Sequence, residues 1–343
     1  MKNPMSRNQK LTTILMALVL TLVNGLSAQE LESVNVTNVA RAETDIAIQR
    51  MYDLTEGFGK FYHLRTPTPI DMQPVIRMNR DALYSSVVFD LSKPATIIMP
   101  ETNGRYQSLQ VINQDHYSYA KTKPGKYELT QKKVGTKYVY IIIRTFIDAN
   151  DPEDIKIANE LQDAIKVEGG GNDPLELPDW NMEDLETARV ALNSLAALGV
   201  SNKGAFGMPD EVDPVNFLIF AAVGWGGLPN ANTIAFMGAP DKYDGTPYSV
   251  TVKDVPVNAF WSITVYDEKG FIPENEMKVY SFNNVTAKPN EDDSITINFG
   301  GCEDGRVNCI PVTEGWNYTV RMYEPQEEVI NGTWTFPEIK EVK

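Results

Sequence analysis

The sequence predicts a mainly β protein with flanking helices, of the α+β class, with two antiparallel β-sandwich domains of which the second is jelly-roll-like. Three observations predict this class. Short β-rich runs separated by turn residues fill both halves of the chain. Helical patterns precede and separate them. A content of 42% apolar residues over 343 positions is enough for two full cores.

The first 28 residues are typical of a secretory leader. Lys2, Arg7 and Lys10 precede an apolar run over 11–23, and Ala28 supplies a small residue at the expected cut. This apolar run is too short to anchor the chain, because crossing a bilayer takes about 20 residues. We therefore expect cleavage after Ala28 and a mature protein in the periplasm or outside the cell.

Elements of the first half follow in order. A helical pattern over 38–64 ends before the alternating prolines Pro67 and Pro69, which force an extended path. Turn residues then separate β-rich runs, which indicates an antiparallel sheet. The expected strands are 83–91, 95–99, 106–112, 126–129 and 138–146.

A strong helix start follows at Asp151 and Pro152, with an N-cap acid and proline at the first helical position. We expect this helix to run to about 167 and to be followed by a flexible linker over 168–174. The remaining elements alternate helices and then strands. They are helices 182–198 and 214–223 and strands 248–252, 260–266, 278–283, 294–299, 318–323 and 333–336.

These patterns divide the chain into four parts. They are a signal peptide over 1–28, an N-terminal β domain with helices over 29–168, a linker and helical segment over 169–224, and a C-terminal jelly-roll-like domain over 225–343. The formal net charge of -15 becomes more negative when the basic leader leaves. An acidic surface repels phosphate backbones and anionic lipids, so we expect no nucleic-acid partner and no membrane contact after cleavage. A small-molecule ligand and a homo-oligomer are both compatible with this composition.

The two cysteines of the sequence, Cys302 and Cys309, bracket a Gly-, Asp- and Asn-rich stretch. In an oxidising compartment this pattern predicts a disulfide that closes a small loop. A zinc site needs more ligands, and His63 and His116, the two histidines of the chain, are distant in sequence. We expect neither a metal nor another cofactor.

No nucleophile elbow, phosphate-binding glycine loop or zinc-protease helix occurs in the sequence. The densest polar cluster spans 79–85. On a strand Asn79 and Asp81 share one face, where an amide and a carboxylate could bind a substrate, while Arg80 and Tyr84 share the other. The alternative is that Asn79 and Asp81 satisfy backbone donors at the start of a sheet, while Arg80 pairs with an acid.

A second cluster contains Asp115 and His116, an acid beside a group that titrates near neutrality. Strand neighbours face opposite sides, so Asp81 is the better partner for His116 than Asp115. The alternative is a hydrogen-bonded structural histidine.

Two arginines and one tryptophan complete the candidate substrate-binding set, which also contains Asn79, Tyr84 and Asp115. Arg105 and Arg144 could clamp an anionic group, or each could pair with one of the surplus acids. Trp225 lies among glycines and could line a pocket between domains or fill a packing gap.

Several of these motifs resemble a known pair of bacterial domains. Segments 79–85, 104–106, 113–117, 144–145 and 161–165 resemble the domain of unknown function 1254. Segments 224–229, 261–267, 321–323 and 332–334 are similar to its usual companion, the domain of unknown function 1214. The resemblance covers nearly all of the mature chain and implies two mainly β domains in an exported bacterial protein, without an established activity.

Two functions follow as hypotheses. The first is an exported hydrolase of a small polar or ester-like substrate. In it Asp81 and His116 are the general base and acid, Asn79 and Tyr84 position the substrate, and Arg105 or Arg144 binds developing negative charge. The second is a non-catalytic ligand-binding or structural module that uses the same cleft.

Overall fold

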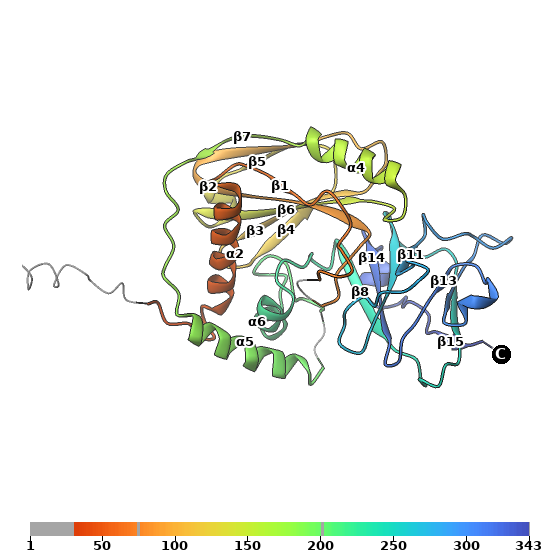
Figure 1. The fold of residues 1–343 in the computed structure, drawn as a ribbon. Coiled ribbons are helices and arrows are strands. Elements are labelled where there is room, and N and C mark those ends of the chain that lie inside the picture. The colour runs from red at the N-terminus through yellow and green to blue at the C-terminus, as the bar shows by residue number, and fades with distance from the viewer. Residues whose placement is uncertain (1–30, 74–75, 200–201, 343) are drawn as a thin grey trace, which may run out of the picture.

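The computed structural model describes residues 31–73, 76–199 and 202–342. The leader expected over 1–28 lies outside the described residues. Within them, no helix is both long and apolar enough to cross a membrane. Two β-rich bodies lie side by side, the N-terminal one on the left of Figure 1 and the C-terminal one on the right.

The N-terminal body is built on a seven-stranded antiparallel sheet. Its order is β1-β2-β6-β3-β4, and β5 and β7 also pair with the long strand β2. The strands are β1 (Tyr62–His63), β2 (Ala82–Met99), β3 (Gln107–Asn113), β4 (Ser118–Lys121), β5 (Gly125–Leu129), β6 (Tyr138–Phe146) and β7 (Lys166–Gly171).

Strand β6 is buried along its whole length, as its run of aliphatic and aromatic residues predicts. One face of the sheet packs into a core that contains Val87, Ile141 and Ile143. Val88 and Ile142 on the other face pack in the core that contains residues of helix α2 (Val39–Thr55), which crosses the strands in Figure 1. The face under α2 forms part of the candidate site.

Helix α2 ends before the predicted limit at 64. Glu56 adopts a left-handed conformation, and the amide of Gly57 donates to the carbonyl of Tyr52 at 2.9 Å. This arrangement terminates the helix because a left-handed residue turns the chain away from the helix axis. The last predicted residues instead include β1.

Helix α4 (Pro152–Ala164) begins as predicted, with the Asp151 carboxylate accepting from the amide of Glu153 at 2.9 Å. The linker expected over 168–174 differs, since its first residues belong to β7. A Cβ on Gly169 would lie 2.5 Å from the carbonyl oxygen of Pro94 in β2. Glycine is therefore needed there for close strand approach, and the glycine run marks pairing where the sequence suggests flexibility.

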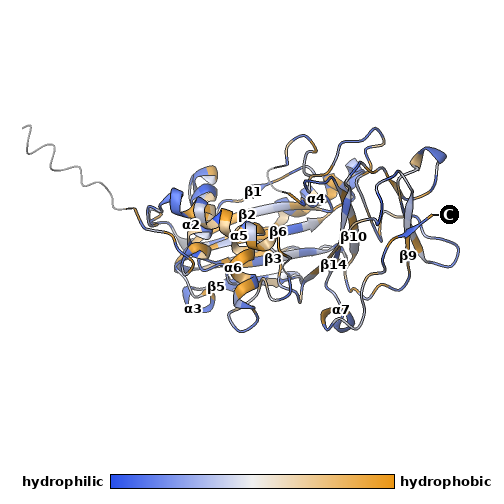
Figure 2. Ribbon diagram, turned by 90° about the horizontal axis from the view of Figure 1, so that it is seen from below, coloured by the Kyte–Doolittle hydropathy of each residue, from blue (hydrophilic) through white to orange (hydrophobic). Residues whose placement is uncertain are grey.

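Helices α5 (Met182–Ala196) and α6 (Pro214–Val223) pack with α2. Their shared core includes Val39, Leu185 and Ile219. Asp213 caps α6 by accepting from two backbone amides, and α6 is coloured largely as apolar in Figure 2. The helical segment thus belongs with the N-terminal sheet.

The C-terminal body is a sandwich of two four-stranded sheets, ordered β11-β10-β14-β8 and β13-β12-β9-β15. Its pairs are antiparallel except for β12 with β13. The strands are β8 (Thr233–Gly238), β9 (Tyr248–Val252), β10 (Trp261–Tyr266), β11 (Ser281–Asn283), β12 (Ile295–Phe299), β13 (Cys309–Ile310), β14 (Asn317–Tyr323) and β15 (Lys340–Glu341). Short helices α3 (Gln131–Val134), η1 (Cys302–Asp304) and α7 (Glu327–Ile330) complete the described elements.

Both sheets contribute to one core, which includes Val250, Ile263, Phe299 and Val320. The strand predicted over 333–336 is wrong, because its aromatic side chains pack against this core from a loop. Strand β8 forms at 233–238, where the sequence pattern predicts no strand. The mainly β, α+β class is confirmed.

Cys302 and Cys309 form the predicted disulfide, with their Cα atoms 5.5 Å apart. Gly301 and Gly305 flank η1 in left-handed conformations, so the chain can turn sharply inside this loop. Cys309 belongs to β13, so the bridge lies at the β13-β12-β9-β15 sheet.

Candidate functional site

A cavity of about 810 Å³ lies between the two bodies. Its walls come from α2, α5 and α6, from β2 and β6 of the N-terminal sheet, and from β8 and β14 of the C-terminal sheet. Such a volume falls within the range of sites for small organic molecules, roughly 300–1,000 Å³.

The C-terminal wall follows from strand alternation. Tyr318, Val320 and Met322 of β14 point into the sandwich core, so the residues between them face outward. Those alternate residues line the cavity together with their direct partners on β8. The three pairs are Thr319 with Met237, Arg321 with Ala235, and Tyr323 with Thr233.

The N-terminal wall is also formed by residues that share one face of a sheet. Tyr84 on β2 lies directly opposite Arg144 on β6, and both line the cavity with Ile142. The guanidinium of Arg144 lies 5.5 Å from the centre of the Tyr84 ring. Arg144 therefore leaves the sheet on the side that carries α2.

The described lining contains five arginines and one acid, Glu43. Glu43 pairs with Arg189 at 2.6 Å. Within the described residues, the other four arginines form no ion pair; they are Arg50, Arg77, Arg144 and Arg321. The cavity is thus strongly positive inside a protein of net charge -15.

Neutral oxygens hold the guanidinium of Arg144. Its Nη1 donates to Oε1 of Gln110 at 2.7 Å, and its Nη2 donates to the carbonyl of Gly226 at 2.8 Å. These acceptors fix the orientation of the group and leave its positive charge uncancelled.

The guanidiniums of Arg77 and Arg321 form a pair, and both lie beside the ring of Tyr266. Arg321 donates to the Tyr266 hydroxyl at 2.9 Å and to the carbonyl of Arg77 at 2.6 Å. Arg77 donates to Oδ1 of Asn317 at 2.8 Å and to the Thr319 hydroxyl at 3.1 Å. Every hydrogen-bond acceptor of these two guanidiniums is again neutral. The buried Asp81 carboxyl interacts electrostatically with Arg321 but forms no ion pair with it within the described residues, so both guanidiniums remain without an anionic hydrogen-bond partner.

Asn79 lines the cavity between these groups. Its side-chain amide donates to the hydroxyl of Tyr323, and its Oδ1 accepts from the amide of Asp81 at 2.6 Å. Burial raises the pKa of Tyr323 well above its usual value, so this hydroxyl stays protonated.

Asp81 is buried behind the cavity wall and does not line it. Its Oδ1 accepts from the amide of Asn283 at 3.3 Å, and its Oδ2 has no hydrogen-bond partner within the described residues. Burial raises the pKa of Asp81. The carboxyl therefore faces the C-terminal sheet and not the cavity.

His116 is also buried and lies outside the lining. Its Nε2 accepts from the amide of Gly226 at 3.1 Å, and its ring stacks on Trp225 with centroids 5.8 Å apart. Burial lowers the pKa of His116 to about 3, so the ring is neutral near pH 7.

Asp81 and His116 are not each other's hydrogen-bond partners, unlike the pairing expected from the sequence, and neither lines the cavity. The two residues contact opposite bodies of the molecule, Asp81 through Asn283 and His116 through Gly226. The general acid and base roles predicted for them find no support in this arrangement. His116 is hydrogen-bonded, as its structural alternative expects. Asp81 instead accepts from a side-chain amide and not from a backbone donor, and Arg80 donates to the carbonyl of Thr68 and not to an acid.

The remaining predicted residues divide between cavity and surface. Trp225 lines the cavity and donates from Nε1 to Thr44 at 3.0 Å, so it both borders the space and packs against α2. Arg105 pairs with Asp154, and Asp115 pairs with Arg41, both outside the cavity lining. For Arg105 the ion-pair alternative is therefore the observed one.

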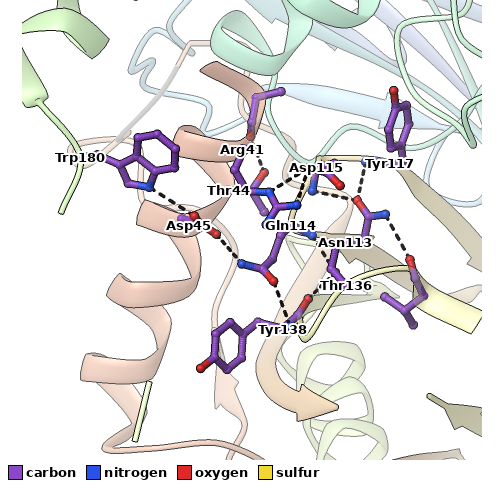
Figure 3. Close-up of polar contacts among 12 residues, drawn as sticks. Arg41, Thr44, Asp45, Asn113, Gln114, Asp115, Tyr117, Thr136, Tyr138 and Trp180 are labelled. Atoms are coloured by element: carbon purple, nitrogen blue, oxygen red, sulfur yellow. Dashed lines mark hydrogen bonds and ion pairs between the residues drawn. The ribbon is translucent and has the colours of Figure 1, made fainter. Parts of the chain in front are cut away.

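Figure 3 shows why the 113–117 turn is structural. Gln114 donates to Asp45 of α2 at 2.8 Å, and Trp180 donates to the same carboxylate at 3.2 Å. Arg41 and Asp115 add an ion pair between α2 and the turn. These contacts tie α2 to the sheet and so fix one wall of the cavity.

His63 has a serine neighbour across the strand pair. Its Nδ1 lies 2.8 Å from the hydroxyl of Ser85, which is fully buried and also accepts from Gln162 at 3.0 Å. Neither residue lines the cavity, so this pair is no nucleophile for a bound molecule. Among the residues that the structure describes, no cluster of His, Cys, Asp or Glu suits a metal ion.

Sequence reasoning missed Arg77 as a site residue and gave Arg321 no role. The usable signal was alternation within 317–323, where apolar Tyr318, Val320 and Met322 enclose an arginine on the opposite face. From sequence alone, an arginine on the outer face of a strand is expected to be exposed to solvent. Only the structure shows that another body covers this face.

Two crystal structures share this fold. The VPA0106 protein from Vibrio parahaemolyticus superposes with a TM-score of 0.67 at 20% identity, over 90% of this chain and 98% of that one. An uncharacterized protein from Burkholderia cenocepacia gives a TM-score of 0.51 at 12% identity, over 89% of this chain and 87% of that one. No curated protein matches the sequence.

Family models match both bodies. One, described as a protein of unknown function (DUF1254), matches residues 58–169, which contain Tyr84, Arg144 and all but the end of the N-terminal sheet. The other, described as a protein of unknown function (DUF1214), matches residues 237–327, which contain Arg321 and Tyr323. The chain thus joins a DUF1254 domain to a DUF1214 domain, and the candidate site lies where the two meet.

Proposed function

We propose that this protein binds a small organic anion in the cavity between its two domains. The observation that carries the proposal is the set of three guanidiniums, Arg77, Arg144 and Arg321, which are held only by neutral oxygens. They come from both domains and line one space.

The physical argument is one of uncompensated charge. Burying a charged side chain costs free energy unless an opposite charge pairs with it. The chain has more acids than bases, so acidic side chains are available as partners for its arginines. Arg105, in contrast, is paired with Asp154. An anionic ligand would supply the anionic partner that Arg77, Arg144 and Arg321 lack, through the N–H groups that they do not use within the protein.

Binding is better supported than hydrolysis. The described lining contains no histidine or cysteine, and its acid, Glu43, is engaged by Arg189. The pKa of Tyr323 is raised by burial, which makes it a poor base near neutral pH. These features favour the ligand-binding hypothesis over the hydrolase.

We further propose that the protein is exported to the periplasm or beyond. The leader pattern over 1–28 motivates this proposal. The disulfide between Cys302 and Cys309 is compatible with it, because such bonds persist in oxidising compartments.

The test is thermal unfolding of the leader-free protein in a buffer without carboxylate or phosphate, with organic anions added singly. A true ligand at 100 times its Kd should raise the free energy of unfolding by about 2.7 kcal/mol. Arg144→Met should lower the affinity for this ligand by about 10- to 100-fold, the usual range for a lost charge-assisted hydrogen bond. Arg306→Met is the control, since Arg306 pairs with Asp304 at the surface. Equal binding by the Arg144 variant, or no response to any anion, would refute the proposal.

A further inference from the structure

Much of the cavity wall is apolar. Ile46 and Ala47 contribute from α2, Ile142 from β6, and Phe220 from α6. On α2 the lining residues are three and four positions apart, so they form one stripe that faces the cavity. An anion without a hydrocarbon body would leave this surface in contact with water.

The glycine loop that follows α6 does not provide a phosphate cradle. The amide of Gly226 donates to His116, and the amide of Gly227 donates to the carbonyl of Gly224 at 3.2 Å. The carbonyls of Gly226 and Gly227 point at Arg144 and Gln110, which donate to them. Because these backbone donors are used within the protein, the guanidiniums are the charged donors of the described lining, and their planar fork fits a carboxylate or a phosphate. A phosphate group has further oxygens that a backbone cradle would normally bind, so the lack of a cradle favours a carboxylate, which has two oxygens.

The cavity also far exceeds the need of a lone carboxylate. Its volume of about 810 Å³ is that of a site for a whole organic molecule. Apolar residues and arginines share the same face of β6, where Ile142 and Arg144 are two positions apart, about 7 Å along a strand.

We infer that the ligand is an amphiphilic carboxylic acid, with its carboxylate at Arg144 and Arg321 and its hydrocarbon body against Ile46, Ile142 and Phe220. This inference rests on the proposed function and specifies its ligand class. Affinity has two independent components, a charge component set by the arginines and a length component set by the apolar wall.

The test measures the Kd of straight-chain carboxylates from acetate to decanoate by titration calorimetry, below their micelle concentrations, with decan-1-ol as the uncharged match. Affinity should rise about fourfold per methylene, the factor that corresponds to burying one CH₂ group. Decan-1-ol should bind about 10- to 100-fold more weakly than decanoate.

Two variants separate the components. Arg144→Met should weaken every member of the series by the same factor and leave the slope with chain length unchanged. Ile46→Ser should weaken decanoate about tenfold and leave short acids unaffected, whereas Ile157→Ser on the exposed face of α4 should change nothing.

The outcomes are distinguishable. If acetate, inorganic phosphate and decanoate bind equally and all depend on Arg144, the protein is an anion binder and the amphiphile inference is overturned. If decan-1-ol matches decanoate, the carboxylate assignment is overturned. If neither the carboxylates nor phosphate bind, the proposed function itself fails.

Discussion

The Nη2 atom of Arg144 donates to the carbonyl oxygen of Gly226 at 2.8 Å, so a guanidinium of the N-terminal sheet is oriented by the loop after α6. Gly226 is itself fixed by a second hydrogen bond, because its amide donates to Nε2 of His116. The position of the loop and the direction of the Arg144 guanidinium are therefore coupled.

Replacement of Gly226 tests this coupling. Its φ of +78° disfavours any side chain, and a Cβ would lie 3.2 Å from Ile142. We expect Gly226→Ala to lower the free energy of unfolding by about 2 kcal/mol and decanoate affinity about tenfold. Gly245→Ala is the matched control, since its φ of +86° carries similar strain with open space around the Cβ. The control should lose about 1 kcal/mol in stability and no affinity, and equal affinity losses in the two variants would contradict the coupling.

His116 should make stability fall in acid. Burial lowers its folded pKa to about 3, while the unfolded chain titrates near 6.5. Between these values the unfolded state binds a proton that the folded state excludes, so this contribution to the free energy of unfolding is complete above about pH 6.5 and is lost as pH falls toward 3. The raised pKa values of Asp45 and Asp81 act in the opposite direction, since their folded states hold protons more tightly.

Comparison of wild type with His116→Gln isolates the histidine, because the acids are common to both proteins. Between pH 6.5 and 4 wild type should lose about 3 kcal/mol more than the variant in urea unfolding, the value of 2.5 pKa units. Parallel curves would show that His116 is accessible to protons in the folded state.

The ion pair of Arg105 and Asp154 should stabilise the fold without affecting the ligand. Hydrogen bonds from Arg105 lower the pKa of Asp154, so the contribution is present above about pH 4 and is lost as pH falls below the unfolded value. We expect Asp154→Asn to lower the free energy of unfolding at pH 7 by about 2 kcal/mol and to leave decanoate affinity unchanged. Asp163→Asn, whose partner Arg65 is much more exposed, should lose less than about 0.5 kcal/mol. Similar losses in both variants would contradict the assignment.

The fold could be predicted where a local pattern decides the structure. The runs over 138–146, 214–223 and 248–252 coincide with β6, α6 and β9, because uninterrupted apolar periodicity leaves few alternatives. The glycine run before Asn172 has the composition of a linker, but its close approach to Pro94 depends on a strand far away in sequence. Local pattern does not contain that information.

The site was predicted in part for the same reason. Asn79, Tyr84, Arg144 and Trp225 were expected from sequence and line the cavity. Asp81, two positions from Asn79, and His116, on the turn after β3, do not line the cavity. Packing between segments far apart in sequence decides which side chains face that space. Arg77 could not be recognised, because its role depends on Asn317 and Thr319, some 240 positions away.

The division of the cavity between two domains has a consequence for how its binding energy acts. Arg144 belongs to one folded body and Arg321 to the other, so cutting the chain between α6 and β8 would yield two polypeptides that each carry an incomplete half of the recognition surface. A molecule seated in the cavity would be bound only when the halves are joined, and part of its affinity would appear as attraction between them. Such a protein is suited to fragment complementation, in which ligand binding would promote association of the two fragments.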